Sequence, residues 1–102
     1  MSEKELYTLL QELEIPVAYD RFKEVQNPPF MAYSMIPADV FNAENKTYYK
    51  SNNFQIEVVT LKHDVELLHQ IEDLFDSHNI PYTTDDEVWD EDEKIYHNYY
   101  LI

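Results

Sequence analysis

The residues in this 102-residue chain whose types and spacing are most suited to binding or catalysis are seven carboxylates near its C-terminal end. They flank Val88 and Trp89 and are Asp85, Asp86, Glu87, Asp90, Glu91, Asp92 and Glu93. Clustered carboxylates can bind a divalent cation, but a calcium loop needs a fixed order of ligands and a glycine, and the chain has no glycine. We therefore predict no metal site. We interpret the run as a solvated hairpin tip, or as a surface that faces DNA or a basic partner.

The other residue types used in catalysis are present but scattered. The four histidines show no metal-binding spacing; they are His63, His69, His78 and His97. The sequence around Ser34, Ser51 and Ser77 does not match that of a nucleophile elbow. Because the chain lacks both cysteine and glycine, thiolate chemistry and glycine-rich phosphate loops are excluded. The sequence predicts no enzymatic activity and no cofactor.

The net charge of −14, from seven basic and twenty-one acidic residues, limits the possible partners. Direct binding of nucleic acid requires a basic surface, and an anionic membrane would repel this chain as well. No apolar run approaches the roughly 20 residues that span a bilayer, and the first residues do not resemble a signal peptide. We expect no membrane association. The acidity fits a soluble particle, a basic partner, or a surface that repels nucleic acid.

The elements that must position these residues are organised around the stretch 51–79, which predicts a strand followed directly by a helix. Within the strand Phe54–Leu61, apolar and polar residues alternate up to Val58, as in a strand with one buried face, while Val59 and Leu61 on the other face predict that its C-terminal half is covered on both sides. Asp64 is a good helix N-cap, and Asn79 and Pro81 are typical of a helix end. The apolar residues between them form one helical stripe, Leu67, Leu68, Ile71, Leu74 and Phe75.

The rest of the chain adds one helix and four strands to this unit. A capping box at Ser2 and Glu5 predicts a first helix of about three turns, ended by Ile15 and Pro16. Strands are predicted at 17–22, 30–36, 82–89 and 94–102, with a polar, projecting excursion at about 37–50 and a turn at 90–93. The acidic hairpin then covers about 82–102. The order α-β-β-β-α-β-β predicts a single α+β domain over 1–102, with a mainly antiparallel sheet and both helices on one face.

Tyrosine and methionine residues on the strands are candidates for a protein–protein interface, because such side chains are enriched there. The candidate residues for a contact between subunits, or with a tube, are Met31, Tyr33, Met35, Val40, Phe41, Tyr48 and Tyr49. The alternative interpretation is an ordinary core with tyrosines at its edges.

The order of the elements and their local sequences resemble those of a known protein family. The leading helix ELYTLLQELEI, the strand PPFMAYS, the excursion FNAENKTYYKSNN, the FQIEVVT strand with its following helix, and the closing hairpin are similar to small tail-terminator proteins of long-tailed phages and prophages. These proteins are also called tail-completion or head–tail joining proteins. The resemblance implies an α+β subunit in a ring, typically a hexamer, that caps the tail tube and contacts the head connector.

This resemblance implies a location in the virion at the tail–head junction, and in the host cytoplasm before assembly. It also gives the acidity a reason, because carboxylates that line the ring's lumen would repel passing DNA. A rival interpretation is an acidic DNA mimic that inhibits a basic, nucleic-acid-binding host protein. A third is an antitoxin-like or adaptor protein. We favour the ring for two reasons. A mimic should spread its carboxylates over several elements, whereas the densest run here lies on one hairpin, and the tyrosine-rich strands are typical of a protein–protein contact.

Overall fold

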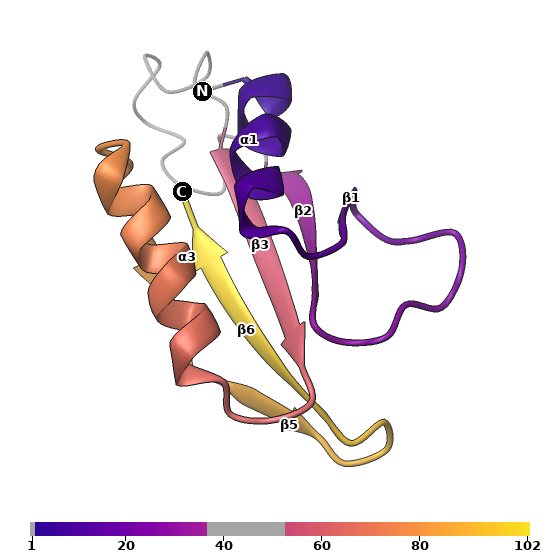
Figure 1. The fold of residues 1–102 in the computed structure, drawn as a ribbon. Coiled ribbons are helices and arrows are strands. Elements are labelled where there is room, and N and C mark those ends of the chain that lie inside the picture. The colour runs from indigo at the N-terminus through magenta and orange to yellow at the C-terminus, as the bar shows by residue number, and fades with distance from the viewer. Residues whose placement is uncertain (1, 37–52) are drawn as a thin grey trace, which may run out of the picture.

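The computed structural model of the chain describes residues 2–36 and 53–102 and has an α+β fold (Figure 1). Two α-helices lie on the same face of a six-stranded sheet. The predicted fold class and the predicted position of the helices are therefore confirmed. The whole of the excursion predicted at 37–50 lies outside the described residues, together with its candidates Val40, Phe41, Tyr48 and Tyr49. No helix in the described ranges is both long and apolar enough to cross a membrane.

The sheet has β3 at its centre, with antiparallel neighbours on both sides. Its strands are β1 (Val17–Tyr19), β2 (Phe30–Ile36), β3 (Asn53–Thr60), β4 (Thr83–Thr84), β5 (Val88–Asp90) and β6 (Ile95–Leu101). In the order β1-β2-β3-β6-β4, β1 forms one edge, while β4 and β5 both pair with the outer side of β6. The strand predicted at Phe54–Leu61 is therefore the central strand of the sheet, and the strand that follows Pro16 lies at its edge.

The first strand differs from the expectation in its length and its direction. It contains three residues where 17–22 was predicted, and it pairs parallel to β2, with Val17 opposite Met31. The strand stops because Asp20 adopts a left-handed backbone conformation with φ of 66°. The connection 20–29 is long enough to return the chain to the end where β1 began, so β2 starts beside it and runs in the same direction.

The other edge is also less regular than a simple hairpin. Thr84 is opposite Tyr100, and Val88 is opposite His97, so three residues on this edge face two residues on β6. This extra residue is a β-bulge, which interrupts pairing and re-aims side chains. The single strand predicted at 82–89 is therefore two short strands, and Glu87 lies in the bulge between them.

The helix α1 (Glu3–Leu10) begins at the predicted capping box and continues into a single 3₁₀ turn, η1 (Gln11–Leu13). The backbone N–H of Glu5 donates to Ser2 Oγ at 3.1 Å, and the backbone N–H of Ser2 donates to Glu5 Oε1 at 3.0 Å. The hydrogen bond from the Ser2 backbone N–H is the main cause of a lowered pKa of the Glu5 carboxyl, and the Ser2 side chain lowers it further.

Replacing Ser2 with alanine should lower the free energy of unfolding by about 0.5–2 kcal/mol, because one helix-end N–H loses its acceptor. Urea denaturation measures the change. Thr8→Ala is a matched control, because Thr8 is exposed on the same helix. An equal, small effect of the two substitutions would show that the capping box contributes nothing to stability.

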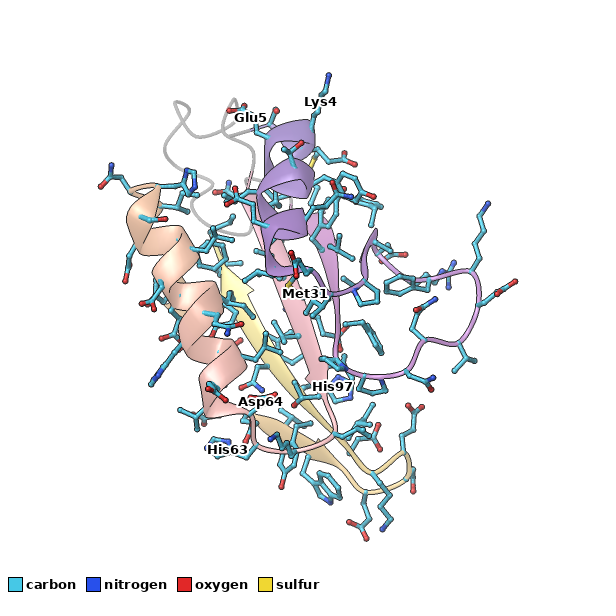
Figure 2. All side chains as sticks on the ribbon, in the orientation of Figure 1. Lys4, Glu5, Met31, His63, Asp64 and His97 are labelled. Carbon is cyan, nitrogen blue, oxygen red and sulfur yellow. The ribbon has the colours of Figure 1, made fainter. Side chains whose placement is uncertain are left out.

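The helix α3 (Val65–Ser77) packs its predicted stripe onto the sheet. Asp64 caps it, since its Oδ1 accepts from the backbone N–H of Leu67 at 3.1 Å, and Figure 2 shows Asp64 at the turn that enters the helix. Asn79, the residue expected at the helix end, adopts a left-handed backbone conformation with φ of 57°. The core beneath both helices is contiguous and includes Leu6, Leu9, Leu10, Met31, Tyr33, Phe54, Ile56, Val58, Leu67, Ile71, Phe75 and Tyr100.

Tyr100 joins α3 to β6 through a buried polar contact. Its hydroxyl donates to Glu72 Oε2 at 2.7 Å, and its ring packs edge-on against Phe75. Burial, supported by the hydrogen bond to Glu72, raises the pKa of Tyr100 far above its ordinary value. The folded protein therefore keeps this tyrosine neutral at pH values where the unfolded chain ionises it.

The sign of the pH effect follows from this difference. Stability from the neutral Tyr100 is complete below the unfolded pKa of about 10, and above that pH it falls by about 1.4 kcal/mol per pH unit. Tyr100→Phe should cost about 1 kcal/mol at neutral pH, from the lost hydrogen bond, and should abolish this part of the alkaline decline. Denaturation between about pH 8 and about pH 11 tests this. Parallel pH curves for the two proteins would contradict it.

Candidate functional site

The face of the sheet opposite the helices is the most distinctive surface of the described structure. No helix among residues 2–36 and 53–102 packs on it (Figure 1). We call it the helix-free face. The strand registers assign to it Phe30, Ala32, Ser34, Ile36, Asn53, Gln55, Glu57, Val59, Ile95, His97, Tyr99 and Leu101.

Three polar side chains from three strands meet near the middle of this face. His97 on β6 has its Nδ1 2.6 Å from Glu57 Oε2 on β3, and its Nε2 3.8 Å from Asp90 Oδ2 at the end of β5. The side chains are partly shielded, with 19% of His97 and 30% of Glu57 exposed. An imidazole that faces a carboxylate on each side can donate from both nitrogens when it is protonated. We call these residues, with Tyr99, the Glu57–His97 cluster.

Tyr99 belongs to the cluster through the same carboxylate. Its hydroxyl donates to Glu57 Oε2 at 3.4 Å, and its ring lies parallel to the His97 imidazole with centroids 6.4 Å apart. Burial raises the pKa of Tyr99, and the negative charge of Glu57 adds to the shift. A nucleophile for acyl transfer would need a hydroxyl bonded to the histidine. Within the described ranges, no serine or threonine hydroxyl makes that bond. The contacts of Glu57, Asp90 and His97 join β3, β5 and β6.

A second histidine–carboxylate contact lies at the bulge. Glu87 Oε1 is 2.9 Å from His63 Nδ1, and Glu87 Oε2 accepts from Asn98 Nδ2 at 2.9 Å. Figure 2 shows His63 beside Asp64, at the turn that leads from β3 into α3. The bulge therefore aims Glu87 at this turn, where it connects the turn to β6.

The predicted acidic residues divide between the two ends of β5. At the turn, Asp90 Oδ1 accepts from the backbone N–H groups of Asp92 and Glu93, at 3.0 and 3.1 Å. Glu91 accepts from Lys94 Nζ at 2.8 Å and from Trp89 Nε1 at 2.6 Å, and these bonds lower its pKa. Glu87, Asp90 and Glu91 thus hold the hairpin together.

The other four predicted carboxylates have no such partners among the hydrogen bonds of the described residues. They are Asp85, Asp86, Asp92 and Glu93, and all four are exposed. The first two lie in the bulge and the last two in the turn, so the hairpin presents two small acidic groups and no single cluster. No group of three or more histidine and carboxylate side chains suited to a metal occurs in the part of the chain described.

The predicted interface residues on β2 have different environments. Met31 is fully buried between the sheet and the helices, at the position labelled in Figure 2. Tyr33 is also buried; its ring packs against Tyr7 and Tyr19, and its hydroxyl donates to Glu3 at 3.4 Å. Only Met35 is exposed, at 45%. Met31 and Tyr33 therefore pack in the core of the described structure, and a contact of this strand with another protein stays a prediction.

The Glu57–His97 cluster is the feature that sequence reasoning missed. The alternation in β6 correctly assigns His97 and Tyr99 to one face, and that in β3 places Glu57 on the polar face. The missing information was the register that sets Glu57 opposite Tyr99 and Val59 opposite His97.

Comparison of the chain with known protein families, with curated proteins and with solved structures finds no match.

Proposed function

We propose that this protein is a structural component of a long-tailed phage or prophage, which forms a ring that terminates the tail tube and joins it to the head connector. The observation that carries the proposal is the one-sided sheet. At one end of its helix-free face lie the half-buried side chains of Ile36 and Leu101, and half-buried Tyr99 lies next to Leu101 towards the middle. This architecture supports the resemblance in element order.

A second copy of the chain is the partner that we propose for this end of the helix-free face. Tyrosine and aliphatic side chains are typical of the buried centre of an interface. A contact between two different surfaces of identical subunits closes into a ring when the rotation allows it. Because each subunit carries a charge of −14, subunits repel one another, and salt should favour assembly.

The exposed carboxylates of the hairpin acquire a role in this proposal. Asp85, Asp86, Asp92 and Glu93 would line the lumen and repel the phosphates of DNA on its way through the tail. Mapping these side chains to the outer wall of an assembled ring would contradict this placement. The wider proposal would survive that result, because it rests on the helix-free face.

The functional test is deletion of the gene from a phage or prophage that encodes this chain. Electron microscopy of the lysate should then show tail tubes of uncontrolled length and heads without tails. Supplying the intact chain from a plasmid should restore joined particles. Normal virions after deletion would exclude a terminating and joining role.

One observation favours the rival candidate, an acidic DNA mimic. Exposed carboxylates are not confined to the hairpin, since α1 presents Glu3 and Glu5, and α3 presents Glu66, Asp73 and Asp76. Such a distribution suits a protein that occupies the phosphate sites of a basic groove. A mimic would displace DNA from a basic host protein in a stoichiometric way, and a tail component would not. Competition in a DNA-binding assay, after a pull-down from host lysate, separates the two.

A further inference from the structure

A groove of about 620 Å³ lies at the opposite end of the helix-free face from Leu101. The connection 20–29, which projects beyond β1 and β2 in Figure 1, forms one wall of it. Ala32, Glu57 and Ile95 line the groove from the sheet, and the hairpin turn adds Glu93. The groove is thus built from three strands, a loop and a turn, all within the described part of the chain.

Half of the residues that line the groove are apolar. Phe22 from the connection packs edge-on against Phe30 of β2, with ring centroids 5.4 Å apart. Two apolar side chains that line it are left in water, Val25 with 98% and Leu61 with 64% of its surface exposed. A partner that covers these side chains would gain the free energy of burying apolar surface.

The charge of the groove selects among possible partners. Its lining contains four carboxylates, on Asp20, Glu24, Glu57 and Glu93, and one cation, Arg21. The Arg21 guanidinium lies 3.8 Å from Asp20, so its charge is already opposed. A second copy of the chain, with a net charge of −14, is a poor complement to this groove.

We propose that the groove binds a basic segment of a partner protein, with lysine or arginine residues on both sides of an apolar anchor. The anchor would cover Leu61 and Phe22, and the basic side chains would reach Glu24 and Glu93 at the rim. This inference goes beyond the proposed ring, and it would hold for a monomer as well. Leu101 and Ile36 lie at the opposite end of the helix-free face from Leu61 and Glu93, so variants at these positions test the two surfaces separately.

The direct test is binding of a short synthetic peptide with a central leucine flanked by lysine and arginine, measured by fluorescence anisotropy. Amide shifts in NMR spectra of the labelled protein should map to the connection 20–29, Leu61 and Ile95. Replacing the leucine of the peptide with serine should weaken binding about tenfold, because the anchor is lost. Spermine, which carries charge without an anchor, should bind more weakly than the peptide.

A matched pair of variants separates a groove from general attraction to an acidic protein. Glu24→Gln with Glu93→Gln removes two charges at the groove and should weaken peptide binding about tenfold. Asp73→Asn with Asp76→Asn removes two exposed charges from α3 and should change binding less than about twofold. Equal losses in the two variants, or amide shifts spread over the surface, would overturn the proposal.

A third variant tests the apolar part of the groove. Leu61→Ser should weaken peptide binding and leave the melting temperature unchanged, because the side chain is mostly exposed. A Leu61→Ser variant that binds the peptide normally but sediments with a lower mass than the parent would also overturn the proposal. The groove would then be a contact between copies of this chain.

Discussion

Replacing Ile71 with alanine is expected to lower the free energy of unfolding by about 2–5 kcal/mol. Ile71 is fully buried in the middle of α3, between Leu67 and Phe75, and it packs in the core beneath both helices. The substitution removes apolar contacts and leaves a cavity, which the rigid sheet beneath the helix can only partly fill. For a domain of this size, the loss is a large fraction of the total stability.

Chemical denaturation followed by far-UV circular dichroism measures this effect. Asp73→Ala is the matched control, because Asp73 is exposed on the same helix. The control should change the free energy of unfolding by less than about 0.5 kcal/mol. Indistinguishable transitions for the two variants would mean that α3 does not dock on the sheet through this stripe.

The second large effect concerns assembly. If the proposed ring forms through the helix-free face, Leu101→Asp is expected to abolish the association of copies while each copy stays folded. Leu101 lies on the helix-free face, opposite Gln55 on β3 and Thr83 on β4, and is only partly buried in the subunit. In a ring built through this face, the new carboxylate would be desolvated without a partner, and it would add to a charge that is already −14.

Val65→Asp provides the control for this prediction. Val65 is 44% exposed at the first position of α3, on the helix-covered side of the molecule. A carboxylate in the first turn of a helix interacts favourably with the helix dipole, so the subunit should remain stable. Sedimentation velocity should give assembled species for Val65→Asp and monomer for Leu101→Asp. Equal assembly of both variants would show that copies of the chain do not contact one another through the helix-free face.

The elements with the strongest local signals were predictable from sequence. Asp64 and the Ser2–Glu5 pair cap their helices as expected, because capping depends on a few neighbouring residues. The alternation in β3 and the stripe on α3 indicated one buried face each, which is enough to place both helices on the same side of the sheet. The apolar positions of such a pattern are the positions that the fold buries, so the pattern predicts the buried face.

The direction of β1 was not predictable, because three residues carry little pattern and the pairing depends on the path of 20–29. The environment of β2 was ambiguous for a related reason. Both of its faces carry large side chains, since Met31 and Tyr33 pack under the helices while Phe30 lies against Phe22 of the same connection. One apolar face of β2 is therefore partly covered by the connection 20–29, and the sequence of that connection does not indicate this contact.

The candidate sites depend on register, which sequence alone did not supply. Residues 57, 90 and 97 meet because β6 pairs with β3 on one side and with β5 on the other. The acidic run was correctly predicted to lie on a hairpin. Its division by a bulge was not, because the extra residue becomes visible only when both strand registers are known.

Sedimentation velocity over a wide range of protein concentration, at low and at high salt, tests the central claim most directly. The ring proposal predicts a discrete closed species near six subunits, favoured by concentration and by salt, since screening reduces repulsion between acidic subunits. That species should disappear in Leu101→Asp and persist in Val65→Asp. A monomer at every concentration and salt level would contradict self-assembly of this chain and favour the acidic inhibitor.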